Sequence, residues 1–65
     1  MRYWFTINSA LSEKEARKVW ALVSPFNANL TVLLDRALVY GNGDDSVVSS
    51  ISSRLSETGL PVGRG

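Results

Sequence analysis

The sequence predicts a small α+β domain in which two helices cover one face of an antiparallel sheet. Three observations support this prediction. Residues 2–7 are rich in aromatic and β-branched side chains and have the length of a strand. Residues 13–24 and 46–57 place apolar side chains at helical spacing, and an apolar, β-branched stretch lies between them. A chain of 65 residues forms at most one domain, and its stability margin is small.

The first predicted strand contains three consecutive aromatic residues, in the run RYWFTI. Successive side chains of a strand point to opposite faces, so Tyr3 and Phe5 share one face while Trp4 points to the other. Because the helices of this small domain cover one face of the sheet, we assign Tyr3 and Phe5 to the core. Trp4 then lies on the uncovered face, where a large aromatic side chain is unusual.

The first helix has a well-marked beginning and end. Ser12 and Glu15 match a capping box, which predicts a helix from Glu13 to Val23 or Ser24. Pro25 ends it, because the residue before a proline is biased away from helix. Four apolar residues form its core-facing stripe: Ala16, Val19, Trp20 and Val23.

The middle of the chain, LTVLLDRALVY, reads as a hairpin with strands at 30–34 and 37–40. Asp35-Arg36 would form the turn, but this pair does not suit a two-residue turn that needs positive φ at both positions. The register therefore stays open, and a one-residue slip would reverse the two faces. The alternative is one long strand that turns at Asn42-Gly43, although the apolar residues that follow do not alternate as a strand requires.

The second helix is predicted over residues 46–57. Asp44 or Asp45 caps its beginning, and Gly59 suits the C′ position. Its apolar residues recur at helical spacing: Val47, Val48, Ile51 and Leu55. A short edge strand is expected at 60–62.

The domain is therefore expected to span residues 1–62, and residues 63–65 are expected to fray. The resulting order, strand-helix-strand-strand-helix-short strand, resembles the ferredoxin-like split βαβ motif. This resemblance implies a spatial strand order of 4-1-3-2, with both helices on one face. In the simplest hairpin register, Leu34 faces Ala37 and Val32 faces Val39 on the helix side. Seven residues then occupy the open side: Arg2, Trp4, Thr6, Thr31, Leu33, Leu38 and Tyr40.

The composition excludes several chemistries. The chain contains neither cysteine nor histidine, so the commonest ligands of zinc and the usual general base at neutral pH are missing. We predict a protein that is not an enzyme, with no catalytic residue, metal or cofactor. No stretch approaches the ~18 apolar residues of a membrane span, which indicates a cytoplasmic protein without a membrane partner.

Among families that share the layout, the metal chaperones need a CxxC pair and the phosphocarriers need a histidine, so both are excluded. The small amino-acid-binding ACT domains have a similar length and order, but the glycine expected in their first strand-helix loop is missing from INSALSE. The resemblance is therefore one of fold alone.

The open side suggests the function, because large apolar side chains on a solvated sheet face mark an interaction site. We predict self-association, or binding of another protein, through five residues: Trp4, Thr31, Leu33, Leu38 and Tyr40. The alternative is single-stranded nucleic acid, whose bases would stack on Trp4 and Tyr40 next to Arg2. The net charge of +1 does not favour that alternative, and the segment ALVYGNGDD lacks the basic and aromatic pattern of RNA-recognition domains.

Overall fold

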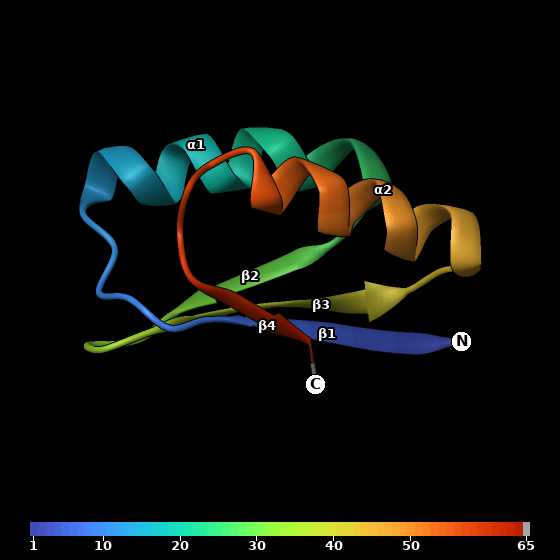
Figure 1. The fold of residues 1–65 in the computed structure, drawn as a ribbon, viewed down its shortest axis with the longest axis horizontal. Helices are drawn as coiled ribbons and strands as arrows, with labels where there is room; N and C mark the ends of the chain where they lie inside the picture. The colour runs from blue at the N-terminus through green and yellow to red at the C-terminus, as the bar shows by residue number, and fades with distance from the viewer. Residues whose placement is uncertain (65) are drawn as a thin grey trace.

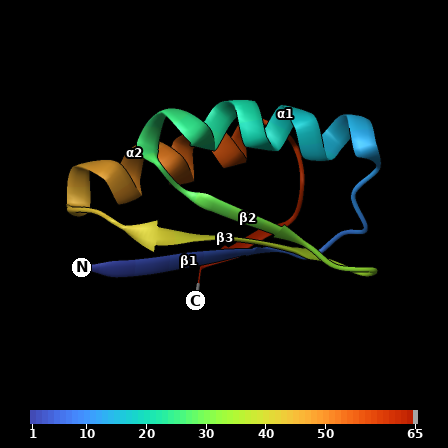
Figure 2. The same cartoon turned by 180° about the vertical axis from the view of Figure 1, so that it is seen from behind.

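The computed structural model describes residues 1–64 of the chain and shows a four-stranded sheet with two helices packed on one side of it (Figures 1 and 2). The elements are, in chain order, β1 (Arg2–Ile7), α1 (Glu13–Val23), a 3-10 turn (Ser24–Phe26), β2 (Asn29–Val32), β3 (Ala37–Asn42), α2 (Asp45–Ser56) and β4 (Val62–Arg64). The predicted α+β class and the two helices are confirmed.

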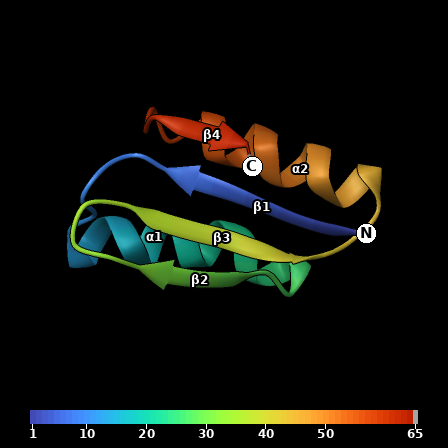
Figure 3. The same cartoon turned by 90° about the horizontal axis from the view of Figure 1, so that it is seen from below.

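The strand order across the sheet is β2-β3-β1-β4, and all three neighbouring pairs are antiparallel (Figure 3). The central strands β1 and β3 pair over their full length, with Trp4 opposite Tyr40 and Phe5 opposite Val39. The outer strands are shorter, so β1 and β3 form the middle of both faces of the sheet.

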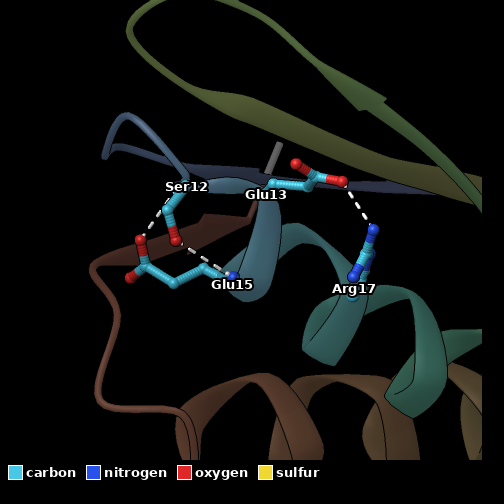
Figure 4. Close-up of polar contacts among 4 residues, drawn as sticks. All are labelled: Ser12, Glu13, Glu15 and Arg17. Carbon is cyan, nitrogen blue, oxygen red and sulfur yellow. Dashed lines mark hydrogen bonds and ion pairs between the residues drawn. The ribbon is translucent and has the colours of Figure 1, made fainter.

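Helix α1 begins with the predicted capping box (Figure 4). The backbone N–H of Ser12 donates to Glu15 Oε1 at 2.9 Å, and the backbone N–H of Glu15 donates to Ser12 Oγ at 3.1 Å. Hydrogen bonding to its carboxylate by the backbone and the side chain of Ser12 holds the pKa of the Glu15 carboxyl below its usual value. On the exposed surface of the same turn, Arg17 pairs with Glu13 at i,i+4.

Helix α2 is capped by Asp44, whose Oδ1 accepts from the Val47 backbone N–H at 2.9 Å. At the other end, Thr58 Oγ1 donates to the Leu55 carbonyl at 2.6 Å and accepts from the Leu60 N–H at 3.1 Å. Gly59 has the positive φ expected of a glycine that ends a helix, at 76°, but it lies one residue beyond C′ because Glu57 is the C-cap.

The core lies between the sheet and the helices. The predicted assignment of Tyr3 and Phe5 to this core is confirmed, because their exposed fractions are 4% and 1%. The remaining buried apolar residues are Ile7, Val19, Val23, Ala28, Ala37, Val39, Val48, Ile51 and Leu55.

The prediction that Trp20 belongs to the core stripe is wrong, because half of its surface is exposed. Val19 and Val23 face the sheet, and Leu22 packs beside them. Trp20 lies on the other margin of the stripe, where α1 packs on the edge strand β2. No strand lies beyond β2 among residues 1–64, so that margin of the helix stays open to solvent.

The predicted hairpin register is wrong by two residues. Val32, not Leu34, faces Ala37, and Leu30 faces Val39. The chain reverses through a four-residue loop, 33–36, in which the Leu33 N–H donates to the Arg36 carbonyl at 2.8 Å. This longer loop needs no positive φ at Asp35 or Arg36. A shift of two residues keeps every strand side chain on its expected face, but it leaves Leu34 98% exposed at the loop instead of in the sheet.

The last strand is Val62–Arg64 and not 60–62. Helix α2 ends at Ser56, and residues 57–61 connect it to the sheet. Leu60 packs on the core from this connection. The Asn8 N–H donates to the Pro61 carbonyl at 2.8 Å, and the ladder continues with Ile7 opposite Val62. Residues 63 and 64 therefore pair with β1, so the expected fraying is wrong for them, and Gly65 lies outside the described residues.

Candidate functional site

The face of the sheet opposite the helices is the candidate site, and Figure 3 views the molecule from that side. We call it the open face. The alternating burial of β1 and β3 places one set of side chains in the core and the other set here. The open face consists of Arg2, Trp4, Thr6, Asn29, Thr31, Leu38, Tyr40 and Asn42.

The middle of the open face is an aromatic pair. Trp4 and Tyr40 lie directly opposite each other on the two central strands. They are 53% and 40% exposed, far more than the core aromatic residues on the other face. Side chains opposite each other on antiparallel strands are close enough to act as one surface. The structure therefore brings together the two aromatic residues that the sequence assigned to this face.

Tyr40 is oriented by a hydrogen bond across the strands. Its hydroxyl lies 3.1 Å from Thr31 Oγ1 on β2. Thr31 is paired with Leu38, two residues from Tyr40 on the same strand, so the Tyr40 ring leans diagonally across β3 and β2. This contact restrains the ring and reduces the entropy that it would lose on binding a partner.

The other predicted site residues are divided between the strands and the loop. Leu38 and Thr31 are half-buried neighbours of the aromatic pair, and Thr6 lies opposite Leu38 on β1. Arg2 is exposed on β1, two residues before Trp4. Leu33 is 40% exposed but belongs to the loop that follows β2, so it lies at the end of the open face.

The open face carries few charges. Arg2 is its only charged strand residue within residues 1–64, because Arg64 pairs with the core residue Phe5 and so belongs to the helix side. In the loop, Arg36 Nε lies 4.0 Å from Asp35 Oδ1. No group of three potential metal ligands occurs within residues 1–64. Aromatic, hydroxyl and amide groups of this kind can contact a molecule by packing and by hydrogen bonding.

A concave surface lies between the helices. This groove of about 540 Å³ has an apolar floor that includes Val19 and Leu22, and charged residues of both signs stand along its walls. The Arg54 guanidinium lies 5.4 Å from the centre of the Phe26 ring, so one of the cations beside the groove already has a protein partner. The mixture of signs favours no particular class of charged ligand.

The glycine-bearing turn before α2 is structural. The Gly43 N–H donates to the Met1 carbonyl at 2.9 Å, and the Gly43 carbonyl accepts from the Met1 amino group at 3.0 Å. Asp44 caps the helix, so the Gly43 backbone and the Asp44 carboxylate are used within the fold.

No protein-family model, curated protein or solved structure matches this chain. Neither helix within residues 1–64 has the length and apolar character needed to cross a membrane. Besides Leu34, two exposed apolar residues, Trp20 and Val32, are ones that apolar periodicity places toward the core. Both belong to the side of the molecule where no strand of residues 1–64 continues the sheet beyond β2.

Proposed function

We propose that this chain is a non-enzymatic interaction domain with a ferredoxin-like arrangement, and that it self-associates through the open face. The observation that supports the proposal is the exposed pair of Trp4 and Tyr40 at the middle of the sheet. Aromatic residues are enriched at the centres of protein interfaces, where they contribute most of the binding energy.

The surroundings of the pair suit such an interface. Leu38 extends the apolar centre along β3, and the polar side chains Thr6, Asn29 and Asn42 surround it. An apolar centre with a polar rim is the usual anatomy of a protein interface. A second copy is a fitting partner because a chain of 65 residues buries little apolar surface by itself, and two stacked sheets would add a shared core.

Sedimentation equilibrium tests the proposal with a matched pair of variants. Trp4→Lys places a charge at the centre of the open face, whereas Leu34→Lys adds the same charge at a loop residue that is 98% exposed. We expect the wild-type chain and Leu34→Lys to form dimers at ~100 μM. Trp4→Lys should raise the dimer Kd at least ~30-fold, the equivalent of ~2 kcal/mol for the loss of an interface hot spot. A wild-type chain that remains monomeric at ~100 μM would overturn the proposal, as would equal dimerisation of the two variants.

Single-stranded nucleic acid is the second candidate, favoured by the position of Arg2 on the same face as the aromatic pair. Bases would stack on Trp4 and Tyr40 while Arg2 contacts a phosphate. Fluorescence of Trp4 measures this binding in a Trp20→Phe background, which removes the other tryptophan. Oligonucleotides of about eight residues should quench the emission, and added salt should reverse the quenching. Unchanged emission at low salt would exclude this candidate.

A further inference from the structure

Strand β2 forms one edge of the sheet, and its outer side has no neighbouring strand within residues 1–64 (Figure 3). The backbone groups that point to this side can be identified from the hydrogen-bond pattern. The Leu33 N–H donates across the hairpin to Arg36, and in an antiparallel ladder the bonded positions alternate. Asn29 and Thr31 therefore direct their N–H and C=O groups toward β3, whereas Leu30 and Val32 direct theirs outward.

This edge lacks the features that normally protect a sheet edge from pairing. Strand Asn29–Val32 contains no charged residue and no proline. The opposite edge differs, because β4 has three residues, carries Arg64 and follows Pro61. Strand β2 is thus the edge that is open to strand addition.

Apolar side chains border the β2 edge on the helix side. Lys18 and Leu22 line the groove toward α2, so the opposite flank of α1, which contains Trp20, overhangs β2. Trp20 is 50% exposed, and Val32 on the helix side of β2 is 45% exposed. An added strand would therefore gain backbone hydrogen bonds at the edge and apolar contact above it.

We propose that β2 pairs antiparallel with β2 of a second copy about a two-fold axis through Thr31. Leu30 of each copy then lies opposite Val32 of the other, and the outward groups of these residues form about four main-chain hydrogen bonds. The two sheets become one continuous sheet, with the helices of both copies on the same side. Trp20 and Val32 of the two copies lose solvent-exposed surface along the seam.

A second copy of β2 is the occupant that the edge itself specifies. A two-fold axis brings identical strands together with equal length and self-matching hydrogen-bond groups. Because Asn29–Val32 is uncharged, the pairing brings no like charges together. This pairing is independent of the proposed function, since it leaves the open faces of both copies uncovered.

Amide hydrogen exchange measured by NMR tests the pairing residue by residue. Four-residue strands form a small interface, so the measurement compares ~50 μM with ~1 mM protein. We expect the Leu30 and Val32 amides to become at least about fivefold more protected at the higher concentration, because only their N–H groups join the new ladder. The Thr31 amide, already bonded to β3, serves as the internal reference.

Two variants and a control complete the experiment. Val32→Pro removes one outward N–H, and Val32→Lys adds a charge to the edge; each should abolish the concentration-dependent protection of Leu30. Leu34→Lys carries the same added charge off the edge and should retain the protection. Trp4→Lys, which disrupts only the open face, should retain it as well. Unprotected Leu30 and Val32 amides in the wild-type chain at ~1 mM would overturn the edge pairing, whatever the sedimentation result for the open face.

Discussion

The hydroxyl of Tyr3 gives the sharpest test of how the core is packed. Tyr3 is 4% exposed, and its Oη is buried without a hydrogen-bond partner within residues 1–64. A buried polar group without a partner costs about 1–3 kcal/mol of stability. Tyr3→Phe removes this cost and keeps the ring, which lies 6.1 Å from the Phe5 ring between centroids.

We expect Tyr3→Phe to raise the free energy of unfolding by about 1 kcal/mol, because the loss of one oxygen's packing contacts offsets part of the gain. In a domain of this size, that corresponds to a rise in Tm of about 4–8 °C. Thermal and urea denaturation followed by circular dichroism measure both quantities. A variant less stable than the wild-type chain would refute the reasoning, because it would mean that the hydroxyl makes a net favourable interaction.

A double-mutant cycle with Gly41 tests the same contact from the other strand. A Cβ atom at position 41 would lie 2.8 Å from Tyr3 Oη and 3.2 Å from Cζ. Gly41→Ala should therefore destabilise the wild-type chain by about 1–3 kcal/mol, as overpacking does, and less in the Tyr3→Phe background, where the closest contact is gone. Equal costs in the two backgrounds would show that the hydroxyl does not set the packing at Gly41.

The same hydroxyl predicts a dependence on alkaline pH. Burial raises the pKa of Tyr3 in the folded state. The stability contribution of the neutral hydroxyl is thus fully present below the unfolded pKa of ~10 and is lost as the pH rises through the higher folded pKa. The advantage of Tyr3→Phe over the wild-type chain should grow above pH ~10 in urea denaturation. A stability difference between the two proteins that stays constant from pH ~8 to pH ~11, on either side of the reference pKa of ~10, would contradict this assignment.

Three further substitutions test the helix beginnings and the core. The folded-state pKa of Glu15 is lowered by its hydrogen bonds to Ser12, so the stability that its carboxylate contributes is present above pH ~4.3 and is lost as the pH falls through the folded pKa. The difference in urea midpoint between the wild-type chain and Glu15→Gln should therefore shrink from pH ~7 to pH ~3. A difference that does not shrink would contradict this assignment. Gly43→Ala would place a Cβ 2.7 Å from Val47 Cγ1 and should cost about 1–3 kcal/mol in urea denaturation, so an unchanged midpoint would count against the close approach. Ile51→Val, at a fully buried position, should cost about 0.5–1.5 kcal/mol in the same assay, and a loss below this range would indicate a loosely packed core.

Local signals in the sequence predicted both helices well. The Ser12 and Glu15 capping box and the Asp44 cap are hydrogen bonds within one turn, so residue identity and spacing are sufficient to locate them. Strand parity was equally informative, because alternation along β1 separates Trp4 from Tyr3 and Phe5 wherever the strand lies in the sheet. The exposure of Trp4, one of the two aromatic residues of the candidate site, follows from this alternation because the helices cover the other face of the sheet.

Trp4 and Tyr40 share the open face only if the side chains of the hairpin strands are assigned to the correct faces of the sheet. A turn at Asp35-Arg36 gives a register that differs by two residues from the one in the structure. Because a shift by an even number of residues keeps each side chain on the same face of the sheet, Trp4 and Tyr40 still share the open face. The expected place of Leu34 is wrong, because the two-residue shift moves it from the end of the strand into the exposed loop.

The sequence by itself determined which segments form helices, where those helices begin, and which side of β1 enters the core, since these features depend on contacts between residues close in the chain. Only the tertiary structure decided the register of the hairpin, the bounds of β4, and which apolar residues remain exposed. Trp20 and Val32 illustrate the reason: their apolar character is local, but their exposure depends on whether another strand lies beyond β2, and that depends on pairings between residues far apart in the chain.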